Sequence, residues 1–206
     1  MNPENPQNTI NHETKTPTKS KTKKIIILVI IALAVLLVAN KMTGNTILKG
    51  ESEGTKVLLK TTEGDVTIQL YEDMPITTNN FINLVQQGKY DGVIFHRTID
   101  GFMIQGGDPT GTGYGDPSIP NIKDEFTHTG GNKNNRGTIS MANAGPNTGS
   151  SQFFINLVDN NFLDTKHPAF GEIIDGMDVV DKIAKVQTTA QDRPLEDVII
   201  EEARIL

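Results

Sequence analysis

Short runs of alternating or β-branched hydrophobic residues recur along the chain from residue 57 onward. The first two runs, residues 57–61 and 66–70, are separated by four residues that include Gly64. This is the pattern of a β-hairpin, because glycine accepts the positive φ of a tight turn. Six further runs have the same character and predict strands at residues 93–98, 102–105, 137–142, 153–157, 170–174 and 198–204.

Two segments show helical spacing instead. In residues 77–87, apolar side chains recur every three or four positions, and Thr77 or Thr78 can cap the start. Residues 177–186 repeat this spacing. Eight short strands and two helices predict a mainly β fold, a closed eight-stranded antiparallel β-barrel capped by two α-helices.

The longest hydrophobic run lies before this domain. Residues 25–39 are fifteen consecutive apolar residues, with four lysines just before them. A helix of that length covers roughly 22 Å. Counted from Lys24 to Thr43, with Lys24 and Lys41 snorkelling to the headgroups, it reaches the hydrocarbon thickness of about 30 Å. A cleaved signal peptide has a similar apolar length, but residues 37–39 are a poor small-x-small cleavage site.

The pattern therefore favours an uncleaved single-pass anchor over residues 25–43. The lysines predict that the N-terminus stays in the cytoplasm, which would place the following domain on the outer side of the cell membrane. Cleavage, which would release a secreted protein, is the alternative.

The rest of the chain divides around this anchor. Residues 1–24 contain only two apolar side chains, too few to offset chain entropy, and are expected to be a disordered cytoplasmic segment. Residues 44–54 are a polar, glycine-containing linker. Residues 55–206 have the length of one domain.

Charge and composition exclude several classes of function. The chain has 19 Lys and Arg against 25 Asp and Glu, a net charge of −6. Residues 55–206 alone carry −9, which argues against a nucleic-acid partner. Because there is no cysteine, disulfides, thiolate nucleophiles and cysteine-bound zinc are excluded.

The histidine and serine spacings point to no familiar catalytic centre. His96, His128 and His167 are far apart and show no metal-ligand spacing, and His96 is expected to be a hydrogen-bonded structural residue. No serine lies in a nucleophile-elbow motif. The sequence therefore indicates neither a metal nor a cofactor.

The strongest motif places one arginine and one glutamine among large apolar side chains. It reads Phe95-His96-Arg97-Thr98-Ile99-Asp100-Gly101-Phe102-Met103-Ile104-Gln105-Gly106-Gly107-Asp108. If residues 102–105 form one strand, Met103 and Gln105 share a face and Phe102 lies on the other, unless a bulge intervenes. A simpler interpretation is that Arg97 pairs with a surface aspartate.

A second motif, residues 137–155, combines small residues with a phenylalanine pair. Small residues would let a ligand approach the backbone closely, and the phenylalanines could wall a pocket. A glycine- and asparagine-rich loop joining two core strands explains the same pattern equally well.

Together with Phe162-Leu163-Asp164 and Lys166-His167-Pro168-Ala169-Phe170-Gly171, these motifs resemble the cyclophilin-type peptidyl-prolyl cis/trans isomerases. The resemblance runs from about Lys56 to the C-terminus, and we expect a bacterial-like member with an N-terminal membrane anchor. It implies an enzyme that accelerates X-Pro isomerisation in extracytoplasmic proteins as they fold, as a monomer and without a cofactor. Its partners would be proline-containing polypeptide clients.

The resemblance also implies the roles of individual residues. Arg97 would direct its cation to the prolyl nitrogen, and Gln105 would bond the substrate backbone and help to orient Arg97. Ala142 and Asn143 would offer backbone groups to the residue before proline. The implied substrate-binding residues are Phe102, Met103, Ala142, Asn143, Ala144, Phe154, Phe162, Leu163 and His167.

One position departs from the family pattern. Phe162 stands where many members carry tryptophan, so the indole N–H donor is absent. We therefore expect only weak inhibition by cyclosporin-type ligands.

Two other functions fit the same motifs. One is a non-catalytic, membrane-tethered module that binds proline peptides or acts as a chaperone, and the other is a structural envelope protein. The occurrence of Arg97 together with Phe102, Met103 and Gln105 favours the enzyme, because a module that only binds has less need of a cation among apolar groups.

Overall fold

The computed structural model describes residues 54–206. The predicted cytoplasmic segment, the anchor at residues 25–43 and residues 44–53 of the linker lie outside the described residues. Within residues 54–206, the helices are all too short or too polar to cross a bilayer.

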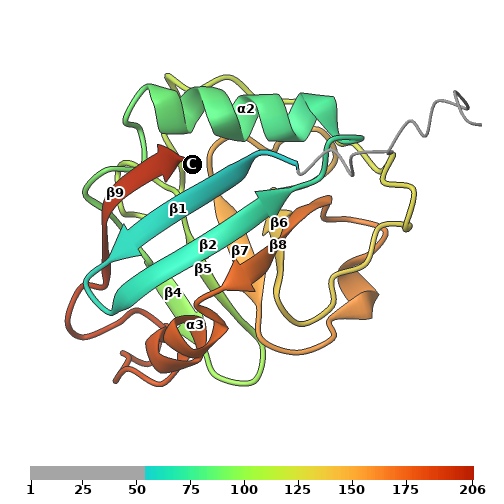
Figure 1. Ribbon diagram of the computed structural model, residues 1–206. Coiled ribbons are helices and arrows are strands. Elements are labelled where there is room, and N and C mark those ends of the chain that lie inside the picture. Colours follow the sequence, from blue (N-terminus) through green and yellow to red (C-terminus); the bar gives the residue numbers. More distant parts are fainter. Residues whose placement is uncertain (1–53) are drawn as a thin grey trace, which may run out of the picture. The chain divides into compact units, whose positions relative to one another are not determined.

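The described residues form one antiparallel sheet of nine strands with two α-helices (Figure 1). The hydrogen-bonded order is β3-β9-β1-β2-β8-β6-β7-β5-β4. The strands are β1 (Lys56–Thr61), β2 (Gly64–Leu70), β3 (Val93–Ile94), β4 (Arg97–Ile99), β5 (Met103–Gly106), β6 (Thr138–Met141), β7 (Phe153–Asn156), β8 (Ala169–Asp175) and β9 (Ile199–Ile205).

The prediction of a closed eight-stranded barrel is wrong in strand count and in closure. The predicted strand at 93–98 is divided into β3 and β4, which are the two edges of the sheet. Phe95 and His96 alone connect these edges, so the edges lie within about 11 Å of each other and the sheet must curl. The hydrogen-bonded order nevertheless ends at β3 and β4. These two edge strands are joined by the chain and do not pair with each other, so the barrel is not closed.

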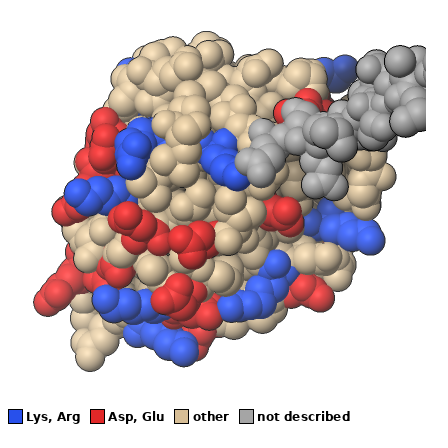
Figure 2. Space-filling model, viewed as in Figure 1, with Lys and Arg blue, Asp and Glu red and all other residues tan. Residues whose placement is uncertain are grey.

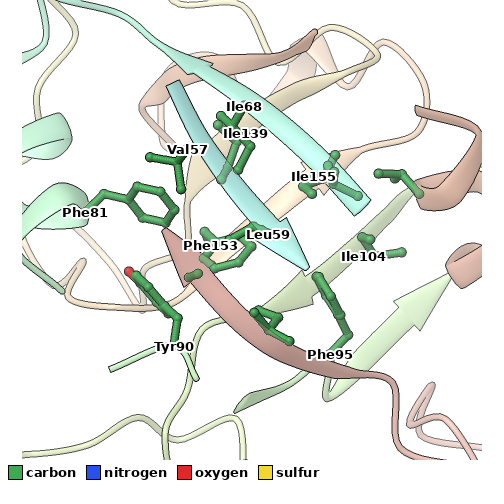
Figure 3. Packing of buried hydrophobic residues seen from close by; sticks show 14 of the residues in the cluster. Val57, Leu59, Ile68, Phe81, Tyr90, Phe95, Ile104, Ile139, Phe153 and Ile155 are labelled. Carbon is green, nitrogen blue, oxygen red and sulfur yellow. The ribbon is translucent and has the colours of Figure 1, made fainter. Parts of the chain in front are cut away.

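The core lies inside the curl. Phe153 is fully buried and makes edge-on contacts with the rings of Phe81, Tyr90 and Phe95 at centroid distances of 5.7, 5.7 and 6.3 Å. Strand alternation supplies most of the aliphatic neighbours, since every second residue of a strand faces inward. Figure 3 shows these groups converging, among them Val57, Leu59, Ile68, Ile104, Ile139 and Ile155.

The two helices lie at opposite ends of the curled sheet (Figure 1). Helix α2 (Pro75–Gln86) begins two residues earlier than expected, because proline is favoured in the first turn. The predicted threonine cap is wrong: Met74 is the N-cap, and the backbone N–H of Thr77 donates to the carboxylate of Glu125, 3.0 Å away. Helix α3 (Met177–Ala184) begins where predicted, after Gly176 with φ 85°.

Charged residues of both signs are interspersed on the face that Figure 2 shows. The net negative charge of the domain is therefore not gathered into one acidic patch on this face.

Candidate active site

Nine of the predicted site residues line one cavity of about 270 Å³. We call it the Arg97 cavity. Its lining residues are Arg97, Phe102, Met103, Gln105, Ala142, Asn143, Phe154, Leu163 and His167.

The register of three neighbouring strands builds one wall of this cavity. Arg97 on β4 pairs with Gln105 on β5, and Gln105 pairs with Phe154 on β7. Directly paired residues of antiparallel strands project to the same face, so these three side chains form a row. Met103, two residues before Gln105, lies on the same face and is 2% exposed.

Phe102 joins the cavity because it precedes the strand. Its backbone N–H donates to the Ile99 carbonyl, 3.1 Å away, in a turn that contains Gly101 at φ 71°. Strand β5 begins only at Met103, so alternation does not fix the direction of Phe102. The condition under which Phe102 would face away from Met103 and Gln105, one strand over residues 102–105, is therefore not met, and Phe102 lines the cavity as the resemblance implies.

Buried asparagines hold the opposite wall in place. The Asn160 Nδ2 atom donates to the Phe102 carbonyl and to Asn156 Oδ1, each at 2.9 Å. The backbone N–H of Asn134 donates to an Asp164 carboxylate oxygen at 2.7 Å. These bonds fix the short segment that carries Leu163 and His167 against β5 and β7. The sequence did not reveal these bonds, because no spacing pattern links residues 134, 156 and 160 to their hydrogen-bond partners.

Arg97 both lines the cavity and contacts a carboxylate. Its Nε atom lies 3.6 Å from Asp192 Oδ2, with side chains 43% and 42% exposed. The simpler interpretation, a surface ion pair, is therefore also correct, and Asp192 is a neighbour that the sequence did not reveal. Neither Nη group of Arg97 donates a hydrogen bond within residues 54–206.

Gln105 is directed toward a different partner from the one expected. Its Nε2 atom donates to Gln152 Oε1 at 2.9 Å, and Gln152 Nε2 in turn donates to the Gly113 carbonyl at 3.0 Å. Within the described part of the chain, Gln105 forms no hydrogen bond with Arg97. Gln105 was predicted to help orient Arg97. In the structure, the two side chains only project from the same face of the sheet.

The backbone N–H groups of Ala142, Asn143 and Ala144 differ in their partners. The N–H of Ala142 donates to the Gln152 carbonyl at 3.0 Å, and that of Ala144 to Thr148 Oγ1 at 2.8 Å. The N–H of Asn143 has no acceptor within residues 54–206. Ala144 lines a neighbouring cavity of about 470 Å³ that shares Gln105, Ala142 and Asn143 with the Arg97 cavity.

Phe162 stands beside the Arg97 cavity and is not part of its lining. Its ring is 69% exposed and stacks on that of Phe102, with centroids 6.0 Å apart and planes 17° apart. The ring offers no N–H donor, and weak cyclosporin binding stays a prediction.

The three histidines of the domain have three different surroundings. His167 Nδ1 lies 3.2 Å from the Met141 carbonyl, and burial lowers the pKa of its imidazole despite that bond. His128 lies 2.9 Å from Asp73 and stacks on Tyr71. His96 is 8% exposed, which fits the expected structural role, but its Nδ1 has no hydrogen-bond partner within the described residues.

The chain is similar in sequence and in fold to known proteins of one kind. Residues 56–205 match the family model of the cyclophilin type peptidyl-prolyl cis-trans isomerases. A peptidyl-prolyl cis-trans isomerase-like 1 of Gibberella zeae is 47% identical over 159 residues, which cover 74% of this chain and 95% of the relative. The isomerase ppi1 of Schizosaccharomyces pombe is 48% identical over 151 residues, covering 70% and 94%.

Solved structures give the same result. A crystal structure of a Cryptosporidium parvum cyclophilin type peptidyl-prolyl cis-trans isomerase has a TM-score of 0.69 and 34% identity, covering 74% of this chain and 97% of that one. A second structure of that protein, in the presence of the dipeptide Ala-Pro, has a TM-score of 0.69 and 35% identity, covering 73% and 98%. These relatives are eukaryotic, so they do not support the expectation of a bacterial-like member.

Proposed function

The chain belongs to the cyclophilin-type peptidyl-prolyl cis-trans isomerases, and from this premise we propose that the Arg97 cavity catalyses the isomerisation by stabilising the twisted X-Pro bond. One observation carries this mechanism. Arg97, Gln105 and Phe154 stand in one row across three strands. A cation, a polar amide and an apolar wall therefore face the same 270 Å³ space.

The chemistry needs no covalent intermediate. Rotation about an X-Pro bond has a barrier of about 18–20 kcal/mol because amide resonance is lost in the twisted state. In that state the prolyl nitrogen regains a lone pair, so a cationic donor stabilises the twisted bond more than either planar form. The guanidinium of Arg97 is permanently charged and suits this role.

The apolar side chains would hold the proline ring. Met103 and Phe154 are 2% and 5% exposed, so they form a fixed floor, and Phe102 and Leu163 stand beside them. A ring anchored there stays in place while the chain on the other side of the bond rotates. This supports proline-containing polypeptides as substrates, the class to which the Ala-Pro dipeptide of the Cryptosporidium structure belongs.

The residue before proline would bind the backbone of Asn143. The N–H of Asn143 is unpaired within residues 54–206, whereas its side-chain Nδ2 is already committed to the Lys166 carbonyl at 2.8 Å. A substrate carbonyl can therefore accept a hydrogen bond from the main chain. This contact is independent of side-chain identity, which suits an enzyme with many clients.

Substitution of Arg97 tests the mechanism. One charge-assisted hydrogen bond contributes about 1.5–3 kcal/mol, so Arg97→Ala in the full chain should lower kcat/KM by at least about tenfold. The rate is measured by exchange NMR on a short Ala-Pro peptide. Arg136→Ala is the matched control, because Arg136 is bound to Asp181 at 2.8 Å and does not line the cavity. An unchanged rate in Arg97→Ala overturns the mechanism.

We further propose that the enzyme is anchored by residues 25–43 and acts on proteins outside the cell membrane as they fold. The support is the run of fifteen apolar residues with lysines before it. The mass of the mature protein tests it, since a chain that starts near residue 40 would mean cleavage. Protease accessibility in intact cells then tests the side on which the domain lies.

We also propose that the enzyme works as a monomer, as its family resemblance implies. Light scattering of the detergent-solubilised chain would reveal a dimer if this is wrong.

A further inference from the structure

The loop between α3 and β9 forms a compact hairpin of its own. We call residues 187–195 the C-terminal loop. The backbone N–H of Thr189 donates to the Arg193 carbonyl at 2.7 Å, and that of Leu195 to the Gln187 carbonyl at 2.8 Å. These bonds close the loop internally, so it meets the rest of the domain as a preformed unit.

Asp192 attaches this loop to β4 at two successive residues. Its carbonyl accepts a hydrogen bond from the backbone N–H of Thr98 at 2.8 Å, and its carboxylate lies 3.6 Å from Arg97 Nε. Main chain and side chain of one residue therefore engage two neighbours on the strand. The position of the carboxylate relative to Arg97 is set by the backbone bond beside it.

The backbone of Asp192 adopts a left-handed conformation to reach this position. Its φ is 64°, and Asn147 is the only other non-glycine residue of the described chain with positive φ. Such a conformation is unfavourable for most side chains and persists where the surroundings enforce it. It clusters at sites with a function, and here it turns a carboxylate toward the arginine of the cavity.

A second contact stabilises the loop from its other side. Arg193 Nη1 donates to the Gly111 carbonyl at 2.8 Å. Gly111 belongs to a segment organised by the fully buried Asp108, which accepts hydrogen bonds from the N–H groups of Thr110, Gly113 and Gly115. Asp192 is thus held between two ordered segments.

We propose that Asp192 is the positioning residue for Arg97 during isomerisation. The carboxylate lies 3.6 Å from Nε. Within residues 54–206, Arg97 forms no hydrogen bond through either Nη group or with Gln105, so both Nη groups can meet the substrate. An exposed ion pair contributes little to folding stability. We therefore expect the Asp192–Arg97 pair to affect the position of the Arg97 side chain. An arginine already restrained loses less rotamer freedom when it meets the twisted bond.

This inference rests on the proposed role of Arg97 and makes a separate prediction. In the full chain, Asp192→Gly accommodates the positive φ without strain. It removes the side chain with its carboxylate and keeps the backbone carbonyl that accepts from Thr98. A 1 Å misplacement can cost about a hundredfold in rate, so a loosened but present arginine should lower kcat by roughly three- to tenfold with KM nearly unchanged. Asp192→Asn retains an oxygen acceptor, and asparagine tolerates the left-handed backbone conformation. Its kcat should therefore lie between those of the unsubstituted chain and Asp192→Gly.

The test combines kinetics with a direct view of the Arg97 side chain. The heteronuclear {1H}–15N NOE of Arg97 Nε reports its order and should fall in Asp192→Gly. The matched control is Asp181→Asn, which removes the negative charge that pairs with Arg136 at 2.8 Å and should change neither kcat nor the Arg97 signal.

The outcomes separate the two proposals. A fall in both kcat and the Arg97 NOE in Asp192→Gly supports positioning. Unchanged kcat, or lower kcat with an unchanged Arg97 NOE, overturns it while the mechanism can stand. Full activity in Arg97→Ala would instead overturn the mechanism itself.

Discussion

Strands β5 and β7 have one face toward the hydrophobic core and one face toward the Arg97 cavity, and the two faces serve different purposes. Toward the core, Ile104 and Ile155 pair with each other and are fully buried. Toward the cavity, Gln105 pairs with Phe154. The core face is completed by apolar packing alone, whereas the cavity face is completed by hydrogen bonds from distant loops. The difference teaches that one strand can carry stability on one side and chemistry on the other.

Among substitutions on these two faces, we expect the largest effect from one on the core face. Phe153→Ala removes a fully buried ring that contacts three other aromatic rings. Truncation of such a ring leaves a sealed void, so the free energy of unfolding should fall by about 3–5 kcal/mol. Urea denaturation followed by circular dichroism measures it. A loss below about 1 kcal/mol would show that the core is not the main source of stability.

The next effect concerns the hydrogen bonds that complete the cavity face. Asn160→Ala leaves the Phe102 carbonyl and Asn156 Oδ1 without a bond that each now accepts at 2.9 Å. The Phe102 carbonyl still accepts from the Leu157 N–H at 3.0 Å, so the loss falls mainly on the buried Asn156 oxygen and should lower the free energy of unfolding by about 1–3 kcal/mol. Because Phe102 lines the cavity, kcat/KM should fall as well. Asn161→Ala, at an exposed position of the same segment, is the control and should change neither quantity appreciably.

These two variants also mark the limit of what the sequence reveals. Alternation in β5 and β7 predicts which residues face the core, because a strand has period two. The cavity residues were predicted only through family resemblance, since no spacing links residue 97 to residue 154. Asp192 could not be predicted at all: it lies in a loop distant from Arg97 in sequence, and no periodic pattern joins them. The division of residues 93–98 was missed because a hydrophobic pattern does not reveal where a strand changes partners.

Phe154→Ala sharpens the comparison, because Phe153 and Phe154 are neighbours in sequence on opposite faces. The Phe154 ring borders a cavity that is already open, so its truncation creates no sealed void and should cost only about 1–2 kcal/mol of stability. The apolar wall for the proline ring is lost, and kcat/KM should fall by roughly tenfold, about 1.4 kcal/mol. Equal losses of stability in Phe153→Ala and Phe154→Ala would contradict the division between the faces.

The smallest expected effect is a dependence on pH at the rim of the cavity face. Burial lowers the pKa of His167, which packs edge-on against Phe154 with ring centroids 5.4 Å apart. An unfolded histidine titrates near pH 6.5, so as the pH falls below that value the unfolded chain binds a proton that the folded chain does not. The free energy of unfolding should therefore decrease from pH 6.5 downward. His96, whose pKa is also lowered by burial, should contribute in the same direction.

Activity should respond differently from stability in this experiment. Above pH 6.5 the His167 imidazole is neutral and its Nδ1–H donates to the Met141 carbonyl, so kcat/KM should stay level between about pH 6.5 and 8. His167→Gln keeps a donor and lacks the titration, so it should weaken the loss of stability below pH 6.5. A step in kcat/KM above pH 6.5 that disappears in His167→Gln would show that this histidine titrates during catalysis, and the cavity face would then carry a second ionisable group beside Arg97.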